Sequence, residues 1–234
     1  MSDVVEMIRL QEIAGFPKTP ALAYGNLSDL HRQWIPDNFW CSAIVWGLPL
    51  PDEVVGEIDH GPTPRYAQTY RDWNRRLDAI ANEAVACLET QGIHAKAIPA
   101  SKTIDFSNMR AEASHRHLAA ALGMGWIGKH GLLVTKQWGP ALRLVTVLLD
   151  KPIEPSPPLT MGECGNCQDC VDSCPVNALE SPIDAQKLNR CWNLLKKHRS
   201  NPDIGSSVCG ICLKVCRDSL PPYIVGENIR GVTF

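Results

Sequence analysis

The sequence has little net charge, no long apolar run and almost no cysteine in its first two thirds. Its 234 residues include 23 lysines and arginines against 25 aspartates and glutamates, so the formal net charge is −2. A protein held to nucleic acid chiefly by phosphate contacts would need an excess of positive charge, which argues against that class although a local basic patch is compatible with this balance. No apolar run approaches the roughly 20 residues that cross a bilayer.

The first residues, Met-Ser-Asp, show neither a basic region followed by an apolar stretch nor a twin-arginine pair. No secretory signal is therefore visible, and we expect a soluble, cytoplasmic protein without membrane contact. The hydrophobic fraction of 44% is ordinary for a globular chain. The length suits one large domain, or a medium domain with a small one.

Hydrophobic patterning predicts an α+β domain over residues 1–150. Apolar residues at steps of three and four predict a short helix over 1–13 and a long helix over Tyr66–Gln91, with Gly92 as the cap beyond its end. An alanine-rich segment predicts a helix over Met109–Leu122. Residues that favour β-structure predict four strands, the last two joined by a turn at 138–140: 39–46, 93–98, 132–135 and 141–149.

A proline-rich segment follows this domain. Four prolines fall among the eight residues from Lys151 to Pro158. That composition cannot hold a regular helix and predicts a stiff linker over 151–160. The linker separates the first domain from a cysteine-rich module at 161–234.

Eight of the ten cysteines lie in that module. The first four have the C-x2-C-x2-C-x3-C-P spacing of bacterial ferredoxins: Cys164, Cys167, Cys170 and Cys174, followed by Pro175. Four more thiols come from Cys191, Cys209, Cys212 and Cys216. A reducing compartment disfavours structural disulfides, so ligation of a metal or cluster is the better interpretation. The two isolated residues, Cys41 and Cys87, are interpreted as small buried hydrophobes.

The ferredoxin pattern predicts which cysteines share a cluster, because the fourth cysteine of the run ligates the other cluster. One [4Fe–4S] cluster is then held by Cys164, Cys167, Cys170 and Cys216. The other is held by Cys174, Cys191, Cys209 and Cys212. Zinc is the alternative, since paired C-x2-C units also build four-thiolate zinc sites, but the x2, x2, x3 spacing ending in proline fits zinc poorly.

The segment Leu122–His130 contains three glycines in the spacing of the dinucleotide-binding fingerprint: Gly123, Gly125 and Gly128. The fingerprint requires a strand before the glycines and a helix after them, and here the expected order is reversed. A P-loop is excluded as well, because His130 stands where a Ser or Thr would bind magnesium. Two interpretations remain: a helix end with tight packing, or a turn whose backbone approaches a bulky flat ligand.

The sequence HRHLAAALGMGWIGK at 115–129 is followed by LLVT, by Gly139-Pro140, by a β-like segment and then by the linker and the CxxCxxCxxxCP module. This order resembles the epoxyqueuosine reductases and their paralogues, iron–sulfur relatives of the corrinoid reductive dehalogenases. The resemblance covers about 111–220 well and the N-terminal hundred residues weakly. It implies a nitroreductase-like α+β domain that holds cobalamin, followed by a ferredoxin-like domain with two [4Fe–4S] clusters.

The resemblance also implies roles for individual residues. Electrons would pass from an external low-potential donor of the ferredoxin or flavodoxin type through the clusters to cobalamin. The corrinoid would be bordered by Gly123, Gly125, Trp126, Gly128, Lys129, Leu133 and Arg143. At the position of the family's acidic proton donor this chain has Met109, so the candidate acids are Asp105, four residues earlier, and His115.

The sequence departs from the family pattern at positions that bear on which substrate and which class of function we expect. Cys216 is followed by Arg217-Asp218 rather than by proline, and the net charge is small, which favours a small or nucleoside-type substrate over tRNA itself. The alternative function is a non-catalytic ferredoxin-type electron carrier without corrinoid. A simple carrier does not need about 150 residues before its clusters, so the sequence favours the enzyme.

Overall fold

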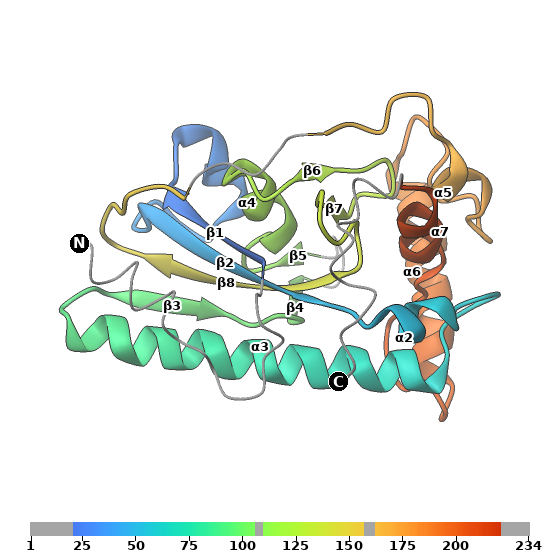
Figure 1. Cartoon of the computed structure of the whole chain (residues 1–234), viewed down its shortest axis with the longest axis horizontal. Coiled ribbons are helices and arrows are strands. Elements are labelled where there is room, and N and C mark those ends of the chain that lie inside the picture. Colours follow the sequence, from blue (N-terminus) through green and yellow to red (C-terminus); the bar gives the residue numbers. More distant parts are fainter. Residues whose placement is uncertain (1–20, 106–109, 157–161, 221–234) are drawn as a thin grey trace.

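The computed structural model describes residues 21–105, 110–156 and 162–220, and the helix expected over 1–13 lies outside them. A four-stranded antiparallel sheet of order β1-β2-β8-β3 forms the centre of the first part of the chain (Figure 1). Its strands are β1 (Ala21–Asn26), β2 (Ser42–Pro49), β8 (Leu142–Leu149) and β3 (Ala95–Ile98). The chain therefore has a mixed helix and sheet fold, as the patterning predicts.

Helices cover both faces of this sheet. The long helix α3 (Pro64–Thr90) packs on one face, and α4 (His115–Ala121) with the 3-10 helix η1 (Asp29–Trp34) packs on the other (Figure 1). Seven of the eight residues of each central strand, β2 and β8, are buried. Because both faces are covered, these strands have nearly continuous apolar sequences and not an alternating pattern.

The helix α3 confirms the predicted long helix nearly to the residue. The Thr63 hydroxyl accepts a hydrogen bond from the backbone N–H of Tyr66, and Pro64 occupies the first turn, where its missing N–H costs nothing. Beyond the end of the helix, Gly92 has a φ of +68°, which favours glycine. At 27 residues the helix is about 40 Å long, and its first turns extend past the sheet towards the cysteine-rich helices (Figure 1).

One local prediction is wrong. The helix expected over Met109–Leu122 begins only at His115, because Ser114 is extended and its N–H donates to the Trp34 carbonyl. The preceding Arg110–Ala111 forms β5, paired with β4 (Thr103–Asp105). The two strands expected at 132–135 and 141–149 are present, with a turn between them: β7 (Leu133–Val134) pairs with β6 (Trp126–Ile127), and β8 pairs with β2 and β3.

The first residues of the proline-rich segment lie along the sheet domain. Ile153 is buried, and its N–H donates to the side-chain oxygen of Asn26. The N–H of Ser156 donates to the carbonyl of Tyr24 at 2.8 Å. Residues 153–156 are therefore attached to the edge strand β1 by hydrogen bonds.

The cysteine-rich part contains α5 (Asp169–Asp172), α6 (Ala185–Ser200) and α7 (Ile211–Ser219), gathered at one end of the molecule with the short helix α2 (Asp52–Gly56) (Figure 1). A buried apolar cluster joins this part to the first one. It includes Val55, Ile58 and Tyr66 from the first part and Val208 and Ile211 from the second. The two parts thus share a core. None of the helices that the structure describes combines the length and apolar character needed to span a bilayer.

We predict that truncating this shared core destabilises the whole chain. Ile58 is fully buried in it, so Ile58→Ala is expected to lower the free energy of unfolding by about 2–5 kcal/mol, measured by urea unfolding followed by circular dichroism. Leu188→Ala is the control, because Leu188 is 56% exposed and its truncation should change stability by less than about 0.5 kcal/mol. Equal effects of the two substitutions would contradict the shared core.

Candidate functional site

The eight cysteines of the module come from three helices and from the loops that flank α5 and α7. Cys164 and Cys167 precede α5, which carries Cys170, and Cys174 follows that helix. Cys191 lies in the middle of α6. Cys209 precedes α7, and Cys212 and Cys216 lie one turn apart within it.

The electrostatic interactions among these thiols fall into two groups of four. Burial raises the pKa of Cys216 to about 12, and the nearby thiols of Cys170, Cys164 and Cys167 raise it further. The pKa of Cys170 is raised by burial and then by Cys164 and Cys167. These are the four residues that the ferredoxin pattern assigns to the first cluster.

The pKa values of the thiols in the second group are raised by the same causes. Burial raises the pKa of Cys212 to about 12, with further contributions first from Cys209 and Cys191 and then from Cys170 and Cys174. The pKa of Cys191 is raised by burial and by Cys209 and Cys174. The two groups therefore lie side by side, with Cys170 close enough to Cys212 for their charges to interact.

The donor chemistry of these groups fits iron–sulfur clusters. Within the described residues, no three or more His, Cys, Asp or Glu side chains form a group that could hold a metal ion. Four thiolates in each group are the donor set that a [4Fe–4S] cluster takes. Buried thiols with raised pKa values ionise only where cations compensate the charge, and the irons of a cluster supply that charge.

The glycine-rich turn links α4 to the two-stranded ribbon of β6 and β7, so the helix-then-strand order expected from the sequence is confirmed. At Gly125 a Cβ atom would lie 2.0 Å from the carbonyl oxygen of Val134, so only glycine allows this close backbone approach. Gly123 and Gly128 lie at either side of it, and Leu133 is buried in the core on the α4 side of the sheet.

Two residues of this turn contact the cysteine loop. The Lys129 ammonium donates to the carbonyls of Gly165 and Cys167 at 3.0 and 2.7 Å. The Trp126 ring packs so closely on Gly162 that a Cβ there would lie 2.7–2.9 Å from ring carbons. These residues, expected at the corrinoid, therefore have partners within the chain.

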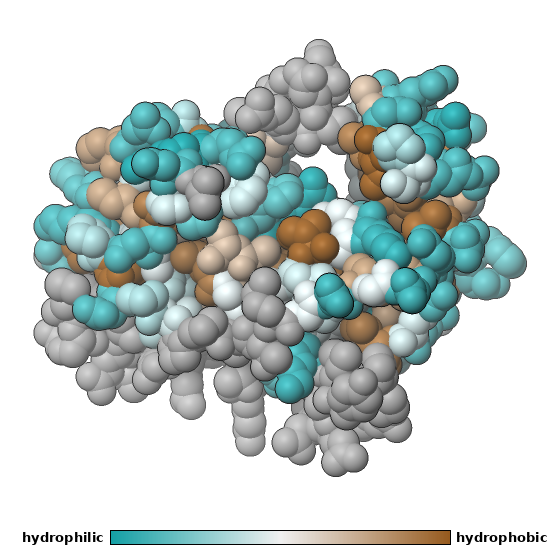
Figure 2. Space-filling model, turned by 90° about the horizontal axis from the view of Figure 1, so that it is seen from above, coloured by the Kyte–Doolittle hydropathy of each residue, from teal (hydrophilic) through white to brown (hydrophobic). Residues whose placement is uncertain are grey.

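Two buried N–H groups of the same region lack partners. The indole nitrogen of Trp126 and Nε2 of His130 are buried without a hydrogen bond among the residues that the structure describes. Nδ1 of His130 accepts from the N–H of Leu132, which leaves the proton of this neutral ring on Nε2. The molecular surface is hollowed between the sheet part and the cysteine-rich part when viewed from the α4 side (Figure 2).

Arg143 lies away from this turn, on the α3 side of β8. Its guanidinium donates to the side-chain oxygen of Asn74 and to the carbonyl of Ala100, and it stacks 4.3 Å from the centre of the Tyr70 ring. Of the residues predicted to border one ligand, the structure brings together those of the turn and places Arg143 in a separate polar network.

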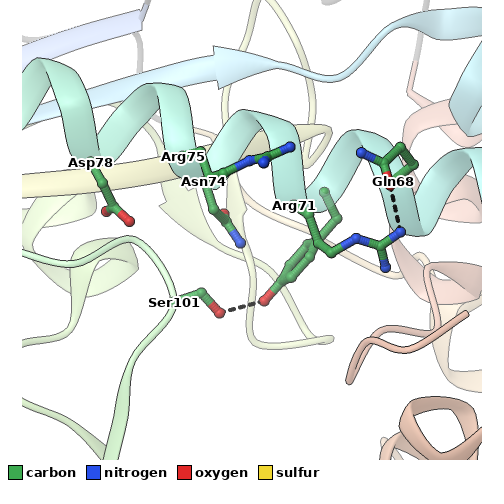
Figure 3. A pocket seen from close by; sticks show the side chains of 7 residues that line it. Gln68, Arg71, Asn74, Arg75, Asp78 and Ser101 are labelled. Atoms are coloured by element: carbon green, nitrogen blue, oxygen red, sulfur yellow. Dashed lines mark hydrogen bonds between the residues drawn. The ribbon is translucent and has the colours of Figure 1, made fainter.

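A polar cavity of about 510 Å³ adjoins that network (Figure 3). It is lined by Gln68, Tyr70, Arg71, Asn74, Arg75, Asp78 and Ser101. The sequence reasoning missed these residues. The available signal was a polar stripe at steps of three and four on the predicted long helix, Arg71, Asn74 and Asp78, beside its apolar face.

The two candidate acids have different surroundings. His115 is held at both ring nitrogens, by the Thr146 hydroxyl at Nδ1 and the Pro99 carbonyl at Nε2. Burial lowers its pKa to about 4, so the ring is neutral at pH 7 and donates its one N–H to Pro99. The backbone of Asp105 lies in β4 opposite Arg110, while its side chain and Met109 lie outside the described part.

Known proteins share segments of this sequence. An epoxyqueuosine reductase of Alicycliphilus denitrificans is 37% identical over 87 residues, which are 36% of this chain and 23% of that protein. One from Synechocystis is 27% identical over 194 residues, covering 79% of this chain and 64% of that protein. No protein-family model matches the chain.

Solved structures share the fold. A catabolic reductive dehalogenase superposes with a TM-score of 0.66 and 17% identity over 90% of this chain and 30% of that one. An epoxyqueuosine reductase with a tRNA-Tyr stem loop superposes with a TM-score of 0.57 and 18% identity over 97% of this chain and 68% of that one. This chain is similar to epoxyqueuosine reductases. It spans only about a quarter to a third of the first curated relatives that it matches.

The buried neutral His115 makes the stability of the chain depend on pH. Its folded pKa of about 4 lies below the ordinary value of 6.5, so the unfolded chain binds the proton first and stability falls as the pH drops below 6.5. Between pH 7 and pH 5 this one residue should contribute a loss of about 2 kcal/mol, and His130, whose pKa is also lowered to about 4, a similar loss.

The expected result is that His115→Gln loses less stability than the wild type between pH 7 and pH 5, measured by urea unfolding at each pH. Glutamine carries an amide at the position of Nε2 but does not titrate. His60→Gln is the matched control, since the His60 side chain is 97% exposed and the substitution should leave the wild-type slope. A slope for His115→Gln equal to that of the control would contradict the assignment.

Proposed function

We propose that this chain is an iron–sulfur oxidoreductase that carries two [4Fe–4S] clusters and binds cobalamin. The observation that carries the proposal is the gathering of eight cysteine thiols in two adjoining groups of four, with Cys170 and Cys212 near each other where the groups meet. The same groups follow independently from the ferredoxin spacing. The similarity to epoxyqueuosine reductases and the fold shared with a reductive dehalogenase support an oxidoreductase.

In this proposal, residues 1–150 form a nitroreductase-like domain that holds the corrinoid and substrate, residues 151–160 the linker, and residues 161–234 a ferredoxin-like domain. The external electron donor is a low-potential protein of the ferredoxin or flavodoxin type. The substrate is a small or nucleoside-type molecule, and tRNA is the less favoured partner.

Cobalamin, when bound, would supply a cobalt centre that passes electrons to the substrate. The chain's own residues then bind and orient it. The unpartnered N–H groups of Trp126 and His130 suit the amide oxygens that surround a corrin ring. Gly125 keeps the backbone of the turn free of a side chain at its closest approach to Val134. Because the single N–H of His115 is already donated to Pro99, we assign the acid to Asp105.

The alternative is an electron carrier without corrinoid. It is favoured by the partners that Lys129, Trp126 and Arg143 find within the chain itself. In that case the turn serves only to attach the cysteine-rich part, and the N-terminal domain docks partner proteins.

One anaerobic experiment separates these functions. The full chain is purified without oxygen, incubated with hydroxocobalamin and passed through gel filtration, and its iron, sulfide, zinc and visible spectrum are measured. The proposal expects about eight irons and eight sulfides per chain together with a retained corrinoid spectrum. Full clusters without corrinoid support the carrier. Zinc without sulfide refutes both functions, and salt-sensitive tRNA binding would bring tRNA forward as the substrate.

The crossed ligand sets generate a prediction of their own. Cys216→Ser and Cys164→Ser are expected to lower bound iron by about half and to remove the same electron paramagnetic resonance signal, because both remove a ligand of the first cluster. Cys174→Ser should affect the other signal, and Cys87→Ser, outside both groups, should leave iron unchanged. Loss of different signals from the Cys216 and Cys164 variants would contradict the pairing.

A further inference from the structure

The loop that carries the first two cysteines is held by a lysine of the other part of the chain. Residues 165–169 are exposed, and the backbone turns at Cys164–Cys167 through a 3.0 Å hydrogen bond. Lys129 closes this turn from outside, with its ammonium on two carbonyls, those of Gly165 and Cys167. One of these acceptors belongs to a predicted cluster ligand.

A second contact fixes the start of the same loop. Gly162 lies against the Trp126 ring at a distance that excludes any side chain at that position. Trp126 and Lys129 are three residues apart in the same turn, so the turn contacts the loop at Gly162 and again at Gly165–Cys167. The position of the loop relative to the sheet domain is therefore set by an apolar contact and by two charge-assisted hydrogen bonds.

Among the described residues, the Lys129 ammonium contacts two carbonyl oxygens and no carboxylate, and the residue is half-buried. Because one of its acceptors is the backbone carbonyl of Cys167, Lys129 is a positive charge next to the first group of thiols.

We infer that Lys129 is a positioning residue of the first cluster: its ammonium seats the Cys164–Cys167 loop and raises the reduction potential of the cluster that the loop holds. This inference rests on the proposed function, because it requires the clusters. One-electron reduction adds one negative charge to the cluster and neither forms nor breaks a bond with the protein. A nearby positive charge stabilises the reduced form more than the oxidised one.

The test uses the full chain with reconstituted clusters and dithionite as the electron source, and follows the reduced clusters by electron paramagnetic resonance during a potential titration. The first cluster is identified as the signal that Cys164→Ser removes. Lys129→Met is expected to disfavour its reduction about tenfold, a shift of about 59 mV to lower potential for one electron. The potential of the second cluster should stay unchanged.

Two variants serve as controls. Lys129→Arg keeps the positive charge and should keep both clusters and most of the potential. Lys136→Met removes an exposed lysine of the same domain and should match the wild type, which shows that the effect is not one of net charge. An unchanged first potential in Lys129→Met with full iron overturns the inference and leaves the proposed function intact. A wild-type chain without iron and sulfide overturns both.

Loss of iron from the variant is also decisive. If Lys129→Met loses only the first cluster while Lys129→Arg keeps both, the role of Lys129 in holding the loop is supported. Arginine keeps a positively charged donor for the loop carbonyls, and methionine does not. If both variants lose iron equally, or if the loss falls on the second cluster, the inference is overturned.

Discussion

The arrangement of the molecule depends on one helix that is longer than the sheet it covers. The C-terminal half of α3 packs on the sheet through Leu77, Ala84 and Leu88. Its first turns extend beyond the sheet (Figure 1). There Tyr66 enters the core that contains Ile211, and Arg71 donates to the carbonyl of Ile204 and the hydroxyl of Ser206. A continuous helix transmits position rigidly, so the second part of the chain is fixed relative to the sheet.

The two groups of cysteines are attached to the first part by different kinds of contact. Near the second group the contact is the apolar core around Tyr66, whose pKa is raised by burial, with further contributions from Cys212 and Cys209. Near the first group it is polar, through Lys129. An apolar core holds geometry without adding charge, whereas a lysine adds a positive charge to the group it touches. The two proposed clusters therefore have different electrostatic surroundings. A difference in reduction potential between them would favour electron transfer in one direction.

The sequence predicts best where a pattern is local. The extent of α3 follows from its apolar steps and from Gly92 beyond its end. The sequence predicts poorly where contacts between distant segments decide the structure. Arg110–Ala111 continues into an alanine-rich stretch but pairs with β4, and no sequence pattern shows that β8 pairs with β2 and β3. The proline-rich segment looks like a free linker because no sequence pattern reveals that Asn26 and Tyr24 bind it.

The glycine-rich turn shows how one short motif can meet two requirements. Its residues resemble those that border a corrinoid, yet Lys129 hydrogen-bonds to the cysteine loop and the Trp126 ring packs against that loop. The indole N–H of Trp126 and Nε2 of His130 are not used by that contact and are buried without partners in the described residues. A buried N–H without an acceptor is costly, so its retention favours a ligand that supplies the acceptor. Contact with the first cluster's loop and contact with a ligand are therefore compatible, and the turn is the segment that would connect them.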